Sequence, residues 1–289
     1  MKLELIDQKE LDYPSASGIE YFDGQIYING DDAGTIFVSN TRWKKVEKVS
    51  LFEAAEPRIP KEIKADLESS AMLQLEGSTY LLLLGSGSRE TRNKGILYDV
   101  VEKTTRELDL SVFYNRLREQ LPDLNIEGAA QVGKELVFAN RGHKKNPANQ
   151  FIITSDDFFR YQSTAPIDTL AVKRPPLKGT IGISGLSYSE RHDLLLFTTS
   201  TENGNSEHND ETIGDSYLGV IENAHWKTGR RKMKVNELIE LPQADKAFKG
   251  FKIESVCIQS TKKSSVKIQL VADNDDGKSH LFKAILKLK

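Results

Sequence analysis

Short apolar runs that follow turn residues recur along the whole chain. The run Gln25–Asn29 follows the turn Phe22-Asp23-Gly24, and Thr79–Leu84 follows Leu75-Glu76-Gly77 in the same way. Turn residues between two short apolar runs are typical of an antiparallel hairpin. The pattern therefore predicts a chain built mainly from strands.

A short motif precedes each of these hairpin turns. It opens with Ser or Glu, continues with a small residue, and then becomes apolar or small. The five copies are Ser17-Gly18-Ile19-Glu20-Tyr21, Glu68-Ser69-Ser70-Ala71-Met72, Glu127-Gly128-Ala129-Ala130-Gln131, Ser184-Gly185-Leu186-Ser187-Tyr188 and Glu254-Ser255-Val256-Cys257-Ile258. Repeats spaced by about 50 to 70 residues across nearly the whole chain are typical of propeller blades.

Two further strands complete each unit. The third strands are Thr35–Ser39, Gly95–Val100, Gln150–Thr154, Tyr217–Ile221 and His280–Leu286, and the less regular fourth ones are Val46–Phe52, Thr105–Leu110, Pro166–Val172 and Val235–Leu241. The fifth unit reaches Lys289 without a fourth strand. We expect Lys2–Leu11 to supply it, because closing the ring removes two exposed sheet edges.

The pattern therefore predicts an all-β fold, a five-bladed β-propeller formed by residues 1–289 as one domain. One or two short helices are expected between blades. Ser111–Leu121 has apolar residues close to helical spacing and is followed by Pro122, and Pro60–Leu67 is the second candidate.

Composition limits the partners and the location of the protein. The formal net charge of −2 gives no electrostatic basis for binding nucleic acid or an anionic membrane. No apolar run approaches roughly 18 residues, so no membrane span is expected. The acidic N-terminal residues do not resemble a signal peptide, which favours a cytoplasmic location. The sequence leaves the oligomeric state open.

The first strand of each propeller blade lines the central channel, so the openers of the five motifs should converge on the axis. These residues, called the axial residues below, are Ser17, Glu68, Glu127, Ser184 and Glu254. Three carboxylates in a narrow channel repel one another unless they are protonated or balanced by a cation. A set of oxygen donors favours a hard ion, Ca²⁺ more than Mg²⁺. The alternative is that these groups cap neighbouring strands and bind channel water.

The loops between second and third strands should gather at one mouth of the channel. We expect Arg89, Arg141 and His143 to bind a small anionic molecule such as a phosphate or carboxylate. Asp31 or Glu202 would serve as a general base across from them. The alternative is that these loops are charged because they are solvated.

The order Ser, Glu, Glu, Ser, Glu at the five blade openers resembles that of the calcium-activated nucleotidases, or apyrases. That resemblance implies a five-bladed propeller with calcium on its axis, held by the axial residues. It covers the openers and the overall size of the chain. The steps Glu127-Gly128 and Ser184-Gly185 also resemble blade starts of phytase-like esterase propellers and their uncharacterised bacterial relatives.

Two function classes remain open from the sequence. The first is a metal-dependent hydrolase of a phosphate- or ester-containing small molecule, similar to a nucleotidase or phosphoesterase. The second is a non-catalytic propeller that binds a ligand or a protein, with a purely structural axial metal. The fold does not distinguish them, because propellers host both classes.

Overall fold

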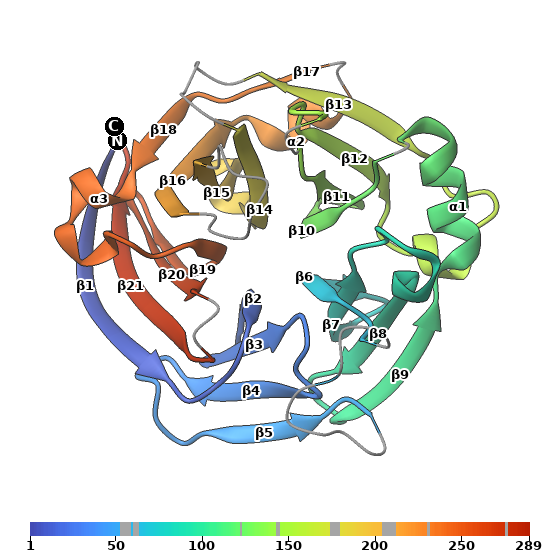
Figure 1. The fold of residues 1–289 in the computed structure, drawn as a ribbon, viewed down its shortest axis with the longest axis horizontal. Helices are drawn as coiled ribbons and strands as arrows, with labels where there is room; N and C mark the ends of the chain where they lie inside the picture. Colours follow the sequence, from blue (N-terminus) through green and yellow to red (C-terminus); the bar gives the residue numbers. More distant parts are fainter. Residues whose placement is uncertain are drawn as a thin grey trace.

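The strands of the computed structural model form five sheets in a ring around a central axis (Figure 1). The structure describes residues 1–52, 59, 64–121, 123–142, 145–173, 180–203, 212–229, 232–274 and 277–289. This arrangement confirms the predicted all-β, five-bladed propeller. Within the described residues, no helix has the length and apolar character needed to cross a bilayer.

Each blade begins at the axis, and the strands of blades one to four continue outward in chain order. Blade one contains β2 (Ala16–Phe22), β3 (Gln25–Gly30), β4 (Thr35–Asn40) and β5 (Glu47–Ser50). Blade two contains β6 (Leu67–Leu75), β7 (Ser78–Gly85), β8 (Lys94–Asp99) and β9 (Thr104–Asp109). Blade three contains β10 (Ile126–Val132), β11 (Glu135–Asn140), β12 (Gln150–Ser155) and β13 (Asp168–Lys173).

Blade four contains β14 (Thr180–Ser189), β15 (Leu194–Asn203), β16 (Thr212–Glu222) and β18 (Glu237–Glu240). An additional short strand, β17 (Lys232–Lys234), precedes β18 in the chain but pairs in parallel with β13. It therefore ties the outer edge of blade three to the chain of blade four. The sequence pattern did not predict this strand.

Blade five closes the ring with the N-terminal strand. It contains β19 (Ile253–Lys262), β20 (Ser265–Asp273), β21 (Ser279–Lys287) and β1 (Lys2–Leu11). β1 pairs antiparallel with β21 from Lys2 opposite Lys287 to Leu11 opposite Ser279. The predicted closure by Lys2–Leu11 is confirmed, and the outer edge of β21 is covered.

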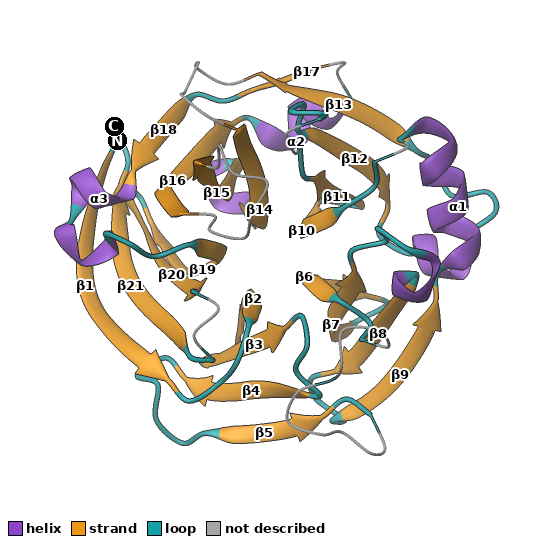
Figure 2. Cartoon of the chain, in the orientation of Figure 1, coloured by secondary structure: helices purple, strands orange, loops and turns teal. Residues whose placement is uncertain are grey.

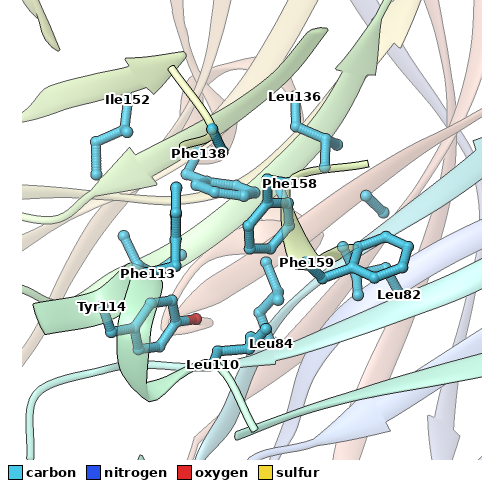
Figure 3. Close-up of a cluster of buried hydrophobic side chains, with 14 of the residues drawn as sticks. Leu82, Leu84, Leu110, Phe113, Tyr114, Leu136, Phe138, Ile152, Phe158 and Phe159 are labelled. Carbon is cyan, nitrogen blue, oxygen red and sulfur yellow. The ribbon is translucent and has the colours of Figure 1, made fainter. Parts of the chain in front are cut away.

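A cluster of buried apolar side chains fills each of the five junctions between neighbouring blades. Figure 3 shows the cluster between blades two and three. There the ring centroids of Phe113 and Phe158 lie 4.6 Å apart, and those of Phe138 and Phe158 lie 5.4 Å apart. Apolar burial of this kind is the main force that holds one blade against the next.

The predicted helix at Ser111–Leu121 is α1 (Ser111–Gln120), which lies at the outer rim between blades two and three (Figure 2). It buries Phe113, Tyr114 and Leu117 in the junction cluster. Pro122 lies outside the described residues. Two shorter helices are α2 (Ala224–Thr228) and α3 (Leu241–Ala244).

The second predicted helix, Pro60–Leu67, falls partly outside the described residues. Residues 60–63 are not described, residues 64–66 have no regular secondary structure, and Leu67 begins β6. The part of this segment that the structure describes therefore contains no helix.

If β1 holds the ring closed through apolar packing, a deeply buried leucine on it should matter more than an exposed isoleucine on the same strand. Leu3 is 3% exposed in the cluster between blades four and five, whereas Ile6 is 49% exposed. We expect Leu3→Ala to lower the free energy of unfolding by about 2–4 kcal/mol. Ile6→Ala should change it by no more than about 0.5 kcal/mol. Chemical denaturation measures both, and equal effects would argue against closure by β1.

Candidate functional site

Each axial residue lies in a β-bulge at the start of an inner strand. In β2, Ala16 pairs with Gly30 and Gly18 with the adjacent Asn29, which leaves Ser17 without a partner across the strand. The same shift occurs at Glu68, Glu127 and Glu254, and at Ser184 together with Gly185. A bulge redirects a side chain away from the regular alternation of a strand. The five blades thus present the same backbone irregularity at one end of the channel, called the channel mouth below.

Small residues after the openers let the inner strands approach one another. A Cβ atom on Gly128 would lie 2.4 Å from the carbonyl oxygen of Ser184. A Cβ atom on Gly185 would lie 2.2 Å from Oγ of Ser255. Both distances are far below a normal contact, so the small second residue of the motif is a packing requirement between blades.

Two of the three axial carboxylates have cationic partners. Nη1 of Arg141 lies 3.3 Å from Oε2 of Glu127, and Nδ2 of Asn125 donates to Oε1 of the same carboxylate at 2.6 Å. Nζ of Lys252 lies 2.7 Å from Oε1 of Glu254. The nearby Glu254 charge raises the pKa of Lys252, and this effect outweighs burial and the positive charge of Arg141, which both lower it. Such pairing is what buried charges require.

The two axial serines also have partners within the chain. The hydroxyl of Ser17 donates to the carbonyl of Ser15 at 3.0 Å. The hydroxyl of Ser184 shares a 2.8 Å hydrogen bond with that of Thr198. Each hydroxyl oxygen still has lone-pair capacity for a further contact.

Glu68 differs from the other axial acids. Within the part of the chain that the structure describes, its carboxylate has no hydrogen bond and no ion pair. Burial raises the pKa of Glu68 well above its usual value, and the negative charge of Glu127 raises it further. Three more carboxylates add to this repulsion, those of Asp31, Asp66 and Glu254. An ionised Glu68 therefore has no counter-ion among the described residues, so a proton or a further cation is needed to neutralise it.

An acidic cluster surrounds Glu68 on the side of blade one. Carboxylate oxygens of Asp31, Asp66 and Glu68 all lie within 4.8 Å of one another. Lys64 bridges Asp31 and Asp66, with its Nζ 2.9 Å from Oδ1 of Asp66. Arg92 lies 2.8 Å from the other oxygen of Asp66. Burial lowers the pKa of Lys64, but its two carboxylate partners outweigh burial and the net change is upward.

Asp31, a predicted general base, is therefore brought next to Glu68. Its Oδ2 pairs with Lys64, while its Oδ1 is buried and accepts no hydrogen bond from the described residues. Burial raises the pKa of Asp31, and Lys64 opposes that rise. Glu202, the other predicted base, lies in β15 with its backbone opposite Thr180 and Ile213, and its side chain is outside the described part.

The predicted anion-binding residues are placed differently from one another. Arg141 reaches the channel mouth, where it packs over Gly182: a Cβ atom there would lie 2.2 Å from Nε of Arg141. Arg89 is exposed just before a short 3₁₀ turn, and its guanidinium has no ion pair with the described residues. Arg92, from the same loop as Arg89, is the one that pairs with Asp66. His143 lies outside the described residues.

Sequence reasoning did not select Asn125 and Lys252, which contact axial acids, or Lys64 and Asp66 of the neighbouring acidic cluster. A signal for three of these four does exist, because the residue two positions before four of the five openers is polar. That position holds Ser15, Asp66, Asn125 and Lys252, whereas Gly182 at the fifth leaves room for Arg141.

The chain belongs to a family described as a family of unknown function (DUF6929), whose model matches residues 12–286. No curated protein matches it. Among solved structures it is similar to a glutaminyl cyclase of Myxococcus xanthus, with 13% identity, a TM-score of 0.55, and 99% of this chain and 97% of that chain covered.

Two other solved structures are comparably similar. A GH43 β-1,3-galactosidase with galactodeoxynojirimycin has 11% identity and a TM-score of 0.51, with 94% of this chain and 90% of that chain covered. The tail fibre of Staphylococcus aureus phage P68 has 10% identity and a TM-score of 0.50, with 99% of this chain and 53% of that chain covered. At such identities these likenesses show the propeller fold alone.

The placement of Arg141 can be tested through the glycine beneath it. Gly182→Ala should displace Arg141 and weaken its pairing with Glu127, lowering the free energy of unfolding by about 1–3 kcal/mol. Gly229→Ala is the matched control, because no atom lies within 4 Å of its added Cβ, and it should change stability by no more than about 0.5 kcal/mol. Denaturant titration of both variants gives the comparison. Two equal effects would mean that Arg141 is not held over Gly182.

Proposed function

We propose that the channel mouth binds Ca²⁺ with Glu68 as its principal ligand, and that the mouth hydrolyses a small phosphate- or ester-containing anion. The observation that supports this most directly is the carboxylate of Glu68, which lies among four other acids and has no cation of its own within the described residues.

Charge balance at the mouth supports a bound cation. The acids there are Asp31, Asp66, Glu68, Glu127 and Glu254, and the described cations are Lys64, Arg92, Arg141 and Lys252. Each of these cations pairs with an acid other than Glu68. An ionised Glu68 thus has no cation partner among the described residues, and either a proton or a further cation must neutralise it.

The donor atoms suit a hard cation. Carboxylate and hydroxyl oxygens are the ligands that Ca²⁺ prefers, and it tolerates an irregular geometry better than Mg²⁺. Asp31 and Asp66 lie close enough to contribute alongside Glu68. The hydroxyls of Ser17 and Ser184 and the carboxylates of Glu127 and Glu254 would add ligands from the axis. Since Lys64 and Arg92 compete for the same acids, we expect weak binding, with a Kd of about 10⁻⁴–10⁻³ M.

The arrangement of the mouth also suits hydrolysis of an anion. The order of the axial residues resembles that of the calcium-activated nucleotidases, which supports a phosphate ester as the substrate class. Bound Ca²⁺ would stabilise negative charge that develops on the substrate. Arg89 and Arg141 would bind its oxygens, with His143 beside them. Asp31, whose Oδ1 accepts no hydrogen bond from the described residues, would take a proton from an attacking water, and Glu202 is the alternative base.

A second function is favoured by one observation. Arg141 and Lys252 already pair with the axial acids Glu127 and Glu254. A network satisfied in this way is typical of a structural role, and it supports a non-catalytic propeller that binds a ligand or protein partner around an axial metal.

Calcium binding is tested by thermal unfolding. Adding millimolar calcium after EDTA treatment should raise the Tm of the wild-type protein by about 2–5 °C, because the ion binds only the folded state. Glu68→Gln should abolish most of this shift. Glu76→Gln is the control, since Glu76 is exposed in the turn between β6 and β7 and pairs with Arg160, and it should keep the full shift. A Tm that responds to neither calcium nor EDTA would contradict the proposal.

Hydrolysis is tested with nucleotides, sugar phosphates and short esters in the presence of calcium. Asp31→Asn should lower kcat by about 10²–10⁴-fold, because it removes the proton acceptor, while Glu76→Gln should leave the rate unchanged. Circular dichroism checks that each variant is folded. Calcium binding without any turnover would favour the non-catalytic function instead.

A further inference from the structure

The channel contains a second polar site beyond the mouth. A cavity of about 150 Å³, called the lower cavity below, is lined by residues of all five inner strands. These residues are Glu20, Tyr21, Ala71, Met72, Ala129, Ala130, Gln131, Leu186, Ser187, Tyr188 and Ile258. They lie about three residues further along each strand than the axial residues, which is about 10 Å at the rise of a β-strand.

Among the described residues that line the lower cavity, Glu20 supplies the only carboxylate. Its side chain is 8% exposed. The hydroxyl of Ser70 donates to its Oε1 at 3.4 Å, and the backbone N–H of Met72 donates to the same carboxylate. No Lys, Arg or His of the described residues forms an ion pair with it. A carboxylate buried without a counter-ion is costly, and it is tolerated where a ligand or a proton neutralises it.

The remaining walls of the cavity are neutral. The small side chains of Ala71, Ala129 and Ala130 leave the volume of the cavity unfilled. The hydroxyl of Ser187 accepts a bond from the N–H of Ile258 and keeps its own proton for another partner. The amide of Gln131 is held by Gln74 and Asp156. The volume corresponds to about five water molecules, which suits a compact group and excludes a nucleotide.

We propose that the lower cavity binds the ammonium group of a small primary amine, with the carboxylate of Glu20 as its counter-ion. An ammonium is a compact cation with three donors, and it needs one carboxylate and neutral acceptors around it. A divalent metal ion would need more anionic oxygens than one carboxylate supplies. A guanidinium is planar and broad, and it pairs best with a carboxylate at an open edge.

The pH dependence of binding has a defined direction. The groups that face Glu20 or share the cavity with it are Ser70 and Met72 on β6, Cys257 on β19, Gln131 on β10, Ser187 and Tyr188 on β14, and Tyr21 on its own strand. Burial raises the pKa values of Cys257 and Tyr188, and burial also raises that of Glu20 well above its usual range. Amine binding requires ionised Glu20, so affinity should rise with pH by up to about tenfold per unit below that pKa.

The test uses n-butylammonium as the probe and n-butanol as its neutral analogue, in buffer with EDTA. We expect saturable binding of n-butylammonium to the wild-type protein by calorimetry, and none of n-butanol. Affinity should increase from about pH 6 to about pH 9, where the amine remains charged. Glu20→Gln should weaken binding by about 10- to 100-fold, whereas Glu76→Gln should not change it.

A second variant keeps the test valid if Glu20→Gln does not fold. Ala130→Val narrows the cavity without changing its charge, and it should also weaken binding. Equal affinity in wild type and Glu20→Gln, or no saturable binding in the wild type, would overturn the proposal. Glu68→Gln should bind the amine as the wild type does, so this result is independent of calcium at the mouth.

Discussion

Charge that is buried at the axis is the constraint on which the rest of this structure depends. Five inner strands meet around a narrow channel, and each begins with a bulge that turns a polar side chain inward. Desolvation makes every unpaired carboxylate there costly. The chain meets that cost with cations placed close by, such as Lys252 beside Glu254 and Arg141 beside Glu127. Apolar clusters at the five blade junctions supply the cohesion that offsets it.

The fold was predictable because its main determinants are periodic. Turn residues and apolar runs repeat with each blade. Because the repeat leaves blade five without a fourth strand, it indicated that β1 would complete this blade. β17 was not predictable in the same way. It is three residues long and joins a strand of another blade, so its pairing depends on how blades three and four sit together.

The site was predictable only in part, and the reason is geometric. The motif identified which residues open each inner strand, but a bulge is a property of hydrogen-bond register and leaves only the following small residue as a signal. The sequence could not tell which arginine of this loop reaches the acids, because that depends on the path of the loop. The loop places Arg92 against Asp66 and leaves Arg89 exposed. Ion pairs across blades, such as Lys64 with Asp31, join residues that no local pattern connects.

At the mouth, cations of the chain pair with the acids, whereas Glu20 in the lower cavity has no ion pair with the described residues. This difference follows from backbone geometry. The mouth receives loops and inter-blade segments, and these carry Lys64, Arg92, Arg141 and Lys252 to the acids. The lower cavity lies further along the strands, where the lining residues come from the inner strands themselves and alternate between channel and core. An inner strand has few positions from which a long cation could reach the axis without leaving a junction cluster unfilled. Among the described residues, Glu20 therefore has the Ser70 hydroxyl and the Met72 N–H as its partners, and the proposed amine would supply the missing counter-ion.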